Sequence, residues 1–371
     1  MKITFIGAGN IGLAMASYIP EEHEVVIHSS RPNDFKDAVT YIDKVTGETS
    51  SRKIDFVTNS YELATRDATY IFITHPSFMI EDTLENIAPF IKDNVKIGIV
   101  PGTGGVEFFA KKVLEKGAIL FGLDRVPCVS RLKEYGQSVV ASKKVKTRLA
   151  TLPNTYSTEV SQAVSELLGM EIEQLDNFLT VTFTPSNPIV HTARLYSMLH
   201  DYEEGVTSWS KNIPFYGEWD DLASKYLLGC DEELQNICNS LTQLNMKGVI
   251  PLTEHYGVST VSELTSKIQS IDTMKHILSP MVMKCNHFDI DKSSRYFLED
   301  FPYGLCILKG FAIITKTDTP YIDKILKWYE KFGNVEYFVK EQFIGKSLKN
   351  STIPQNFGLT TIEDINIFYQ Q

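Results

Sequence analysis

The 371-residue sequence contains only five cysteines, and no two of them are spaced as a CxxC pair. Disulfide frameworks and zinc sites of the finger type need regularly spaced cysteines, so the sequence predicts neither. Scattered cysteines fit a reducing compartment, and we therefore expect a cytoplasmic protein. The sequence also lacks an uninterrupted apolar run of 18 residues, so no membrane-spanning helix and no membrane partner are expected.

Basic charge is also scarce. The chain has 36 lysines and arginines against 46 aspartates and glutamates, which gives a formal net charge of −10. Nucleic-acid-binding proteins need a basic surface, so nucleic acid is not an expected partner. A cleft on an acidic protein can still have a positive electrostatic potential, so the net charge does not exclude small anionic ligands. The length favours two domains of roughly 150–200 residues each.

The N-terminal stretch KITFIGAGNIGLAMASYI joins a short apolar strand to an apolar helix through Gly7, Gly9 and Gly12, in G-x-G-x-x-G spacing. In such a motif the first glycine allows a tight turn, the second lets the backbone approach a pyrophosphate, and the third allows close helix packing. The N–H groups at the helix start, at Asn10 and Ile11, would face the phosphates. A second strand, HEVVIH, follows directly. The pattern predicts a dinucleotide site; the alternative is a turn used only for packing.

The end of that second strand lacks the acidic residue that NAD-binding proteins usually carry for the ribose hydroxyls. The sequence there is His28-Ser29-Ser30-Arg31. Hydroxyl groups and a guanidinium suit a 2′-phosphate, so Ser29, Ser30 and Arg31 predict NADP(H) as the cofactor, with NAD as the second choice. The alternative is a solvated loop from which Arg31 points away.

Strand and helix patterns continue to alternate after this point. Strands at about 69–76, 95–105 and 118–123 alternate with helices, which predicts a parallel, doubly wound, Rossmann-like α/β sheet. Ligands bind at the carboxyl ends of such strands, so His75 and Pro76 are candidate cofactor-binding residues. Their alternative is ordinary turn chemistry. Further strands are expected within 136–153 and 179–185, and the first domain is predicted to cover residues 1–184.

From residue 185 to 371 helical patterns dominate, at about 188–202, 220–246, 260–274 and 320–332, so the second domain is predicted to be all-α. The long helix at 220–246 would offer a face for a homodimer. Asn187 is expected to cap the first helix and Pro188 to begin it. His191 then lies in the first turn, where the helix dipole disfavours an added positive charge. A neutral imidazole suits a general base; an ordinary core histidine is the alternative.

A second polar stretch, SSRYFLEDFPYGL at 293–305, places Arg295, Glu299 and Asp300 among aromatic side chains. Charges in such surroundings need specific partners, because burying an unpaired charge is costly. The pattern by itself leaves a functional and a structural role equally open for each residue.

Taken together, these motifs resemble the opine dehydrogenases of the octopine/nopaline type. The resemblance spans nearly the whole chain, and its most specific parts are Asn-Pro-x-x-His and Arg-Tyr-x-x-Glu-Asp. It is carried by Gly7-x-Gly9-x-x-Gly12, the 101–105 loop, Val126-Pro127 with Arg131, Asn187-Pro188-x-x-His191, Arg295-Tyr296 and Glu299-Asp300-x-Pro302-Tyr303-Gly304. The resemblance implies an NAD(P)H-dependent, metal-free reductive condensation of a 2-keto acid, pyruvate or 2-oxoglutarate, with the amino group of an L-amino acid through an imine.

The resemblance also implies roles for single residues. His191 would be the acid–base catalyst and Asp300 its partner, with Glu299 as the competitor for that place. Arg295 would bind the keto-acid carboxylate, and Tyr303 would contact the substrate. Two other readings stay open: an oxidoreductase similar to ketopantoate reductase or glycerol-phosphate dehydrogenase, which would favour a catalytic lysine where His191 stands, and a non-catalytic NADP-sensing protein.

Overall fold

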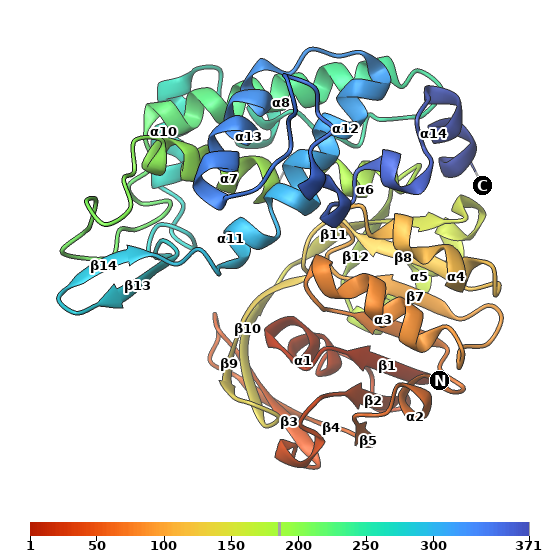
Figure 1. Cartoon of the computed structure of the whole chain (residues 1–371). Coiled ribbons are helices and arrows are strands. Elements are labelled where there is room, and N and C mark those ends of the chain that lie inside the picture. Colours follow the sequence, from red (N-terminus) through yellow and green to blue (C-terminus); the bar gives the residue numbers. More distant parts are fainter. Residues whose placement is uncertain (185–186, 371) are drawn as a thin grey trace. The chain divides into compact units, whose positions relative to one another are not determined.

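The computed structural model describes residues 1–184 and 187–370, and the chain divides into two compact units (Figure 1). The first unit contains Met1–Thr182, the short segment Leu244–Gly248 and the chain from Asn366 on. The second unit contains Phe183–Gln243 and Val249–Ile365. Pro185, the predicted first residue of the second domain, lies outside the described residues.

Hydrogen bonds explain why two late segments belong to the first unit. The guanidinium of Arg148 donates to the carbonyl oxygen of Gly248 at 2.6 Å, and the side-chain amide of Asn177 donates to the carbonyl oxygen of Asn245 at 2.9 Å. Near the C-terminus, the hydroxyl of Tyr369 donates to the buried carboxyl group of Glu107 at 2.6 Å. The sequence analysis placed a single boundary between the domains, after residue 184. It did not predict that two later segments belong to the first unit.

An eight-stranded sheet forms the centre of the first unit, with the order β12-β11-β8-β7-β6-β1-β2-β5. Every neighbouring pair is parallel except β8 and β11. β1 pairs with β2 on one side and with β6 on the other, so the strand order reverses at β1 and the predicted doubly wound fold is confirmed. The strands are β1 (Lys2–Ile6), β2 (Glu24–His28), β5 (Phe56–Thr58), β6 (Tyr70–Ile73), β7 (Lys96–Ile99), β8 (Ile119–Leu123), β11 (Lys146–Leu152) and β12 (Glu171–Gln174).

A second, four-stranded sheet was not predicted as such. It has the order β4-β3-β10-β9 and is built from β3 (Ala38–Asp43), β4 (Thr49–Lys53), β9 (Cys128–Glu134) and β10 (Ser138–Lys143). Helix α1 (Asn10–Ala16) packs against β1 of the first sheet and against β9 and β10 of the second (Figure 1). This position explains the sequence of α1, because a helix covered on both sides is apolar all round.

The remaining helices of the first unit are α2 (Tyr61–Thr65), α3 (Ile80–Ile87), α4 (Lys111–Leu114), α5 (Ser157–Leu168) and α6 (Leu179–Thr182). The strand predicted over 179–185 is wrong where the structure describes it, because α6 is a helical turn. Its threonines and valine favour strands locally, but all four residues are buried, and packing overrides such weak preferences.

The second unit is mainly helical, as predicted. Its helices are α7 (Asn187–Leu199), α8 (Asp221–Ser240), α9 (Leu252–Tyr256), α10 (Val261–Gln269), α11 (Arg295–Leu298), α12 (Cys306–Thr315) and α13 (Pro320–Gly333). A hairpin of β13 (Met281–Lys284) and β14 (His287–Ile290) is an addition to the predicted all-α pattern. The last helix, α14 (Ile362–Tyr369), begins in this unit and ends in the first.

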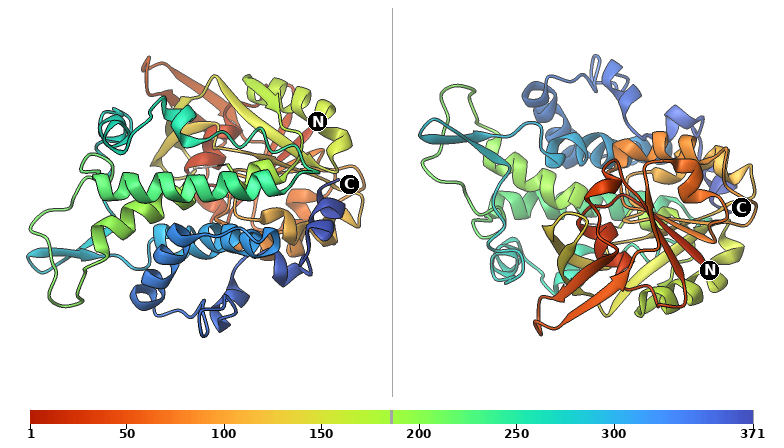
Figure 2. Two further views of the ribbon diagram at one scale, coloured as in Figure 1. Left: turned by 90° about the horizontal axis from the view of Figure 1, so that it is seen from above. Right: turned by 90° about the horizontal axis from the view of Figure 1, so that it is seen from below.

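Helix α8, drawn in green, is the axis of the second unit, and α7, α10, α12 and α13 pack against it (Figure 2). Because four helices cover it, its exposed positions are few and polar: Asp221, Lys225, Glu232, Asn236 and Asn239. The helix therefore offers a narrow polar strip to solvent. Among the described residues, no helix is both long and apolar enough to cross a membrane.

Candidate active site

The glycine motif in the first unit has the geometry of a phosphate-binding turn. Gly7 takes a φ of +104°, which favours glycine. A methyl group placed on Gly12 would lie 1.9 Å from the carbonyl oxygen of Gly7, so the third position needs a glycine for close packing. At Gly9 the same methyl group would meet no atom within 4 Å. The open space over Gly9, at the start of α1, therefore fits an incoming pyrophosphate.

His75 follows β6 and lies beside Gly7, which follows β1. A methyl group on Gly7 would come within 3.0 Å of the His75 ring. β1 and β6 are the strands at which the order of the sheet reverses, and open α/β sheets bind ligands at this point. Burial, with a contribution from His28, lowers the pKa of His75 to about 4, so its ring is neutral near pH 7. The structure thus brings His75 and the glycine turn together, with Pro76 next along the chain.

The three residues predicted to hold a 2′-phosphate gather at the end of β2. The Ser29 hydroxyl is buried and lies 2.8 Å from the hydroxyl of Tyr135. The Arg31 guanidinium lies over the Tyr135 ring, 3.8 Å from its centroid, and 3.5 Å from a carboxylate oxygen of Asp34. Ser30 and Arg31 are exposed. The ring of Tyr135, which sequence reasoning did not identify, therefore supports the guanidinium at this position.

In the second unit, three polar side chains form one buried hydrogen-bonded chain. The Nδ1 atom of His191 lies 2.7 Å from a carboxyl oxygen of Asp300, and its Nε2 atom lies 2.7 Å from the hydroxyl of Tyr216. All three residues are less than 9% exposed. When Asp300 is ionised and the imidazole is neutral, Nδ1 carries the proton and Nε2 accepts from the Tyr216 hydroxyl, because an ionised carboxylate only accepts hydrogen bonds. Burial raises the pKa of Asp300, and the His191 ring opposes that shift.

The backbone around Asp300 brings its carboxyl group to His191. Asp300 lies directly before a π-helical turn, Phe301–Leu305, which joins α11 to α12. This turn packs against α7: a methyl group on Gly304 would come within 2.5 Å of the Pro188 ring. A glycine at this position therefore allows the close approach of the two segments. Asn187, which was predicted to cap α7, already belongs to the helix, and His191 lies four residues after it.

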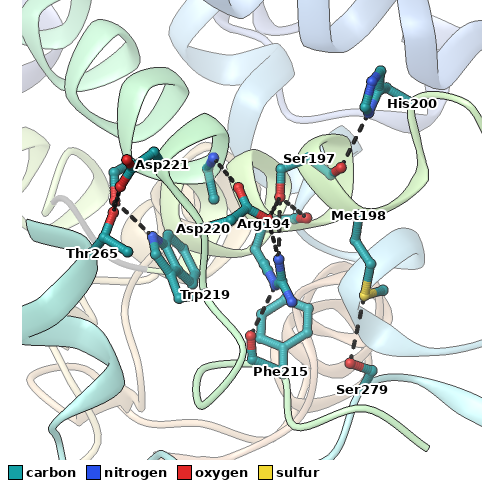
Figure 3. Close-up of polar contacts among 12 residues, drawn as sticks. Arg194, Ser197, Met198, His200, Phe215, Trp219, Asp220, Asp221, Thr265 and Ser279 are labelled. Atoms are coloured by element: carbon teal, nitrogen blue, oxygen red, sulfur yellow. Dashed lines mark hydrogen bonds and ion pairs between the residues drawn. The ribbon is translucent and has the colours of Figure 1, made fainter. Parts of the chain in front are cut away.

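A second, partly buried network fixes the segment that carries Tyr216 (Figure 3). Arg194 lies one turn after His191 on α7, and its Nε–H group donates to the carbonyl oxygen of Phe215 at 3.0 Å. The same guanidinium contacts the carboxylate of Asp220 at 2.6 Å. Asp220 in turn accepts from the backbone N–H of Ala223 and caps α8. The residue before Tyr216 is thus tied to the helix that carries His191.

Arg295 has a different environment from the buried histidine. Its side chain is 65% exposed, and its Nε and Nη2 atoms lie 2.7 and 2.5 Å from one carboxylate oxygen of Glu299. This ion pair is a structural role, which the sequence left open for both residues. Asp300 rather than Glu299 contacts His191 in the structure. Tyr303 lies within the π-helical turn and is half-buried.

Sequence reasoning missed Tyr216 and Arg194 as parts of the site. Tyr216 lies in the stretch NIPFYGEWDD, where a proline and a glycine interrupt any periodic pattern. The only available signal was the density of aromatic and acidic residues in a loop. Arg194 follows His191 at i+3, a spacing that places two residues on the same side of a helix. Neither observation could reveal which hydrogen bonds the two side chains make.

Comparisons with known proteins agree with this arrangement. Residues 2–102 match a family described as NADP oxidoreductase, coenzyme F420-dependent, and residues 174–332 match the alpha-helical domain of NAD/NADP octopine/nopaline dehydrogenase. The chain is 26% identical over 364 residues to an opine dehydrogenase of Haliotis discus hannai, covering 92% of this chain and 89% of that protein. It is 27% identical over 379 residues to a tauropine dehydrogenase of Arabella iricolor, covering 96% and 94%.

A solved structure shares the fold over the whole length. It is an octopine dehydrogenase with NADH and L-arginine, with a TM-score of 0.87 and 21% identity, covering 98% of this chain and 97% of that one. Two successive domain matches, relatives similar over nine-tenths of the chain and this shared fold agree with one another. Residues 174–332 thus carry the alpha-helical domain of the NAD/NADP octopine/nopaline dehydrogenase family, and the chain as a whole is similar to opine dehydrogenases in sequence and in fold.

Proposed function

We propose that this protein is an NADPH-dependent opine dehydrogenase that condenses a 2-keto acid, pyruvate or 2-oxoglutarate, with the amino group of an L-amino acid. The observation that carries the proposal is the buried chain of Asp300, His191 and Tyr216, with both imidazole nitrogens hydrogen-bonded at 2.7 Å. An imidazole with one nitrogen held by a carboxylate is a well-oriented acid–base group. A protein that only senses NADP has no need of such a chain.

His191 would perform the proton transfers of the condensation. The amine must lose a proton before it attacks the ketone, and the carbinolamine must then gain a proton on its hydroxyl group to lose water. One imidazole can accept the first proton and return it in the second step. Asp300 would hold the tautomer with the proton on Nδ1 and stabilise the imidazolium. The buried position of the pair restricts water, which would otherwise compete for these protons.

Arg295 would bind the carboxylate of the keto acid, and Tyr303 would contact the substrate. A guanidinium is the best two-pronged partner for a carboxylate. In the structure the Nε and Nη2 atoms of Arg295 contact a carboxylate oxygen of Glu299, and the arginine side chain remains largely exposed. Binding a keto acid would therefore need either the outer edge of the guanidinium or an exchange of partners. The octopine dehydrogenase structures that hold pyruvate or L-arginine support this substrate class.

NADPH is the proposed cofactor, and it would supply the hydride that reduces the imine. The glycine turn and the first turn of α1, at Gly7, Gly9 and Gly12, would hold the pyrophosphate. Ser29, Ser30 and Arg31 would hold the 2′-phosphate. The support for NADP over NAD is the guanidinium of Arg31 on the Tyr135 ring, together with the lack of an acidic residue among residues 28–31; a 2′-phosphate would compete with Asp34 for this guanidinium.

A matrix of keto acids against amino acids, followed by NADPH absorbance, tests the proposal. We expect oxidation of NADPH only when a 2-keto acid and an amino acid are both present. Oxidation with a keto acid alone would instead indicate a hydroxy-acid dehydrogenase or a ketopantoate reductase-like enzyme. Binding of NADPH without turnover on any pair would favour the sensing protein. A homodimer stays a prediction, which light scattering of the purified chain would check.

A further inference from the structure

Tyr216 is the least expected member of the buried chain. Its hydroxyl lies 2.7 Å from Nε2 of His191, the nitrogen that would have to exchange protons with a substrate, and it donates to Nε2 when the imidazole is neutral. The other ring nitrogen is held by Asp300. Both nitrogens of the imidazole are therefore occupied, and the histidine is only 7% exposed. A proton can reach Nε2 either through the Tyr216 hydroxyl or after Tyr216 has moved away.

The surroundings of Tyr216 oppose its movement. The backbone of the preceding residue, Phe215, makes two hydrogen bonds. Its N–H donates to the carbonyl oxygen of Ile277 at 2.7 Å, and its carbonyl oxygen accepts from Arg194 at 3.0 Å. Arg194 is 3% exposed, and Tyr216 itself is 4% exposed. Removing the tyrosine from Nε2 would break buried contacts and leave a buried imidazole nitrogen without a partner, which is costly.

A tyrosine hydroxyl can pass a proton without leaving its place. It has one O–H donor, used here on Nε2, and two acceptor lone pairs. Burial raises the pKa of Tyr216 well above its ordinary range, with smaller contributions from Tyr296 and Asp300, so the side chain is a neutral phenol. The geometry therefore suits a relay in which the phenol receives one proton as it gives up another.

We propose that Tyr216 relays protons between the reacting amine and His191, an inference that rests on the proposed function. In the forward step an N–H bond of the protonated amine, an ammonium group, breaks and its proton moves to the Tyr216 oxygen, while the Tyr216 proton moves to Nε2. The nitrogen keeps its electron pair for attack on the ketone, and the products are an imidazolium and an unchanged phenol. Loss of water from the carbinolamine uses the reverse transfer, which returns the imidazole to its neutral form.

Replacing Tyr216 by phenylalanine tests the relay, because it removes the hydroxyl and keeps the ring. We expect kcat/KM for the condensation to fall by roughly 10²-fold or more, the scale of general acid–base catalysis, while the Kd for NADPH stays within about twofold. In single turnovers the wild-type rate should depend on the D2O fraction along a curve, since two protons move together. The double variant Tyr216→Phe, His191→Ala should be little worse than His191→Ala alone.

Tyr329→Phe is the matched control. Tyr329 is 6% exposed in the same unit, and its hydroxyl also makes one buried hydrogen bond, to the carbonyl oxygen of Phe297 at 3.0 Å. Its removal should lower the thermal midpoint about as much as Tyr216→Phe does and leave kcat/KM within about twofold.

Three outcomes would overturn the relay while leaving the proposed function intact. They are a Tyr216→Phe enzyme as active as the wild type or more active, a linear dependence of the wild-type rate on D2O, and losses in the double variant that multiply. A faster variant would show that Tyr216 blocks Nε2 instead of serving it. A wild-type enzyme that binds NADPH but never oxidises it with a keto acid and an amine would contradict the proposed function itself. The ¹⁵N chemical shift of His191 Nε2 in wild type and variant checks the hydrogen bond independently of turnover.

Discussion

Each of the two units carries a candidate site, and the two candidate sites are built from different kinds of groups. In the first unit the candidate phosphate turn is made of backbone: Gly7, Gly9 and Gly12 act through conformation, close packing and open space. In the second unit the candidate site is made of buried polar side chains, with Asp300, His191 and Tyr216 in one chain. A backbone site needs a few residue types at fixed spacing, whereas a side-chain site needs partners that the fold brings from distant positions.

Removal of the central side chain should give the largest effect. We expect His191→Ala to lower kcat/KM by roughly 10²- to 10⁴-fold, with NADPH binding unchanged in calorimetry. Asp300→Asn should also lose activity, because an amide can hold the wrong tautomer, and the double variant should be little worse than either. His200→Ala is the control, since this exposed histidine directly follows α7, and its ring makes a hydrogen bond with the Ser197 carbonyl oxygen and an aromatic contact with Tyr196. Losses that multiply would show that His191 and Asp300 act separately.

Alanine variants of Gly12 and Gly9 should differ in effect: the first should lower the stability of the fold, and the second should weaken NADPH binding. In Gly12→Ala the methyl group would lie 1.9 Å from the Gly7 carbonyl oxygen, so we expect a loss of about 1–3 kcal/mol or more in the free energy of unfolding. Gly9→Ala has open space and an ordinary φ of −83°, so it should fold normally. Its methyl group should instead weaken NADPH binding in calorimetry. Equal stability of the two variants, or full binding by Gly9→Ala, would contradict the assignment of the turn.

Arg295→Lys asks whether the exposed guanidinium of the second unit binds substrate. If it does, the KM for the keto acid should rise by about 10- to 100-fold, because an ammonium group cannot reproduce the two-pronged contact. The thermal midpoint should change little, since an ion pair of a 65%-exposed arginine contributes little stability. Glu299→Gln breaks the same pair and is the control. An unchanged KM in Arg295→Lys would show that Arg295 does not bind the keto acid and that its role is the structural ion pair with Glu299.

Arg31→Ala tests whether the Arg31 side chain binds the 2′-phosphate of NADPH, in a candidate site that is otherwise made of backbone. We expect binding of NADPH to weaken by about 1–3 kcal/mol, the scale of a charge-assisted hydrogen bond. Binding of NADH should hardly change. Fluorescence titration with both cofactors measures the difference. Equal losses for the two, or a wild-type preference for NADH, would show that the end of β2 does not select the 2′-phosphate.

The first unit also has a buried carboxyl group, and its titration should change stability and have the smallest effect on turnover. Glu107 is fully buried, accepts hydrogen bonds from Thr182 and Tyr369 at 2.6 Å, and has its pKa raised by burial to about 7. Between its ordinary pKa and about 7, the folded state holds a proton that the unfolded state has lost. The free energy of unfolding should therefore fall by about 3 kcal/mol as pH rises through this window, and then level off.

Glu107→Gln should remove most of this slope in urea unfolding measured at several pH values, because the amide does not titrate. The variant should match the wild type at the acidic end of the window and exceed it in stability above pH 7. A wild type and variant with parallel pH dependence would show that another group is responsible.

Much of the fold follows from local pattern. The glycine spacing, the alternation of strands and helices, and the helical second half predicted the architecture that the structure has. The strand predicted at 179–185 failed because local preference is weak beside burial. The second sheet was missed because its strands come from two separate stretches, 38–53 and 128–143, whose pairing is a long-range choice.

The sequence by itself determined the turn around Gly7, Gly9 and Gly12, because the physical requirement there is local: a positive φ, a close contact and an open approach lie within six residues. It also marked His191 and Asp300 as chemically notable. Only the tertiary structure decided their partners. Asp300 rather than Glu299 reaches His191 because a π-helical turn packs on α7, and Tyr216 reaches Nε2 because Arg194 fixes the loop before it. A hydrogen bond between residues 25 or 109 positions apart depends on packing that no short stretch encodes.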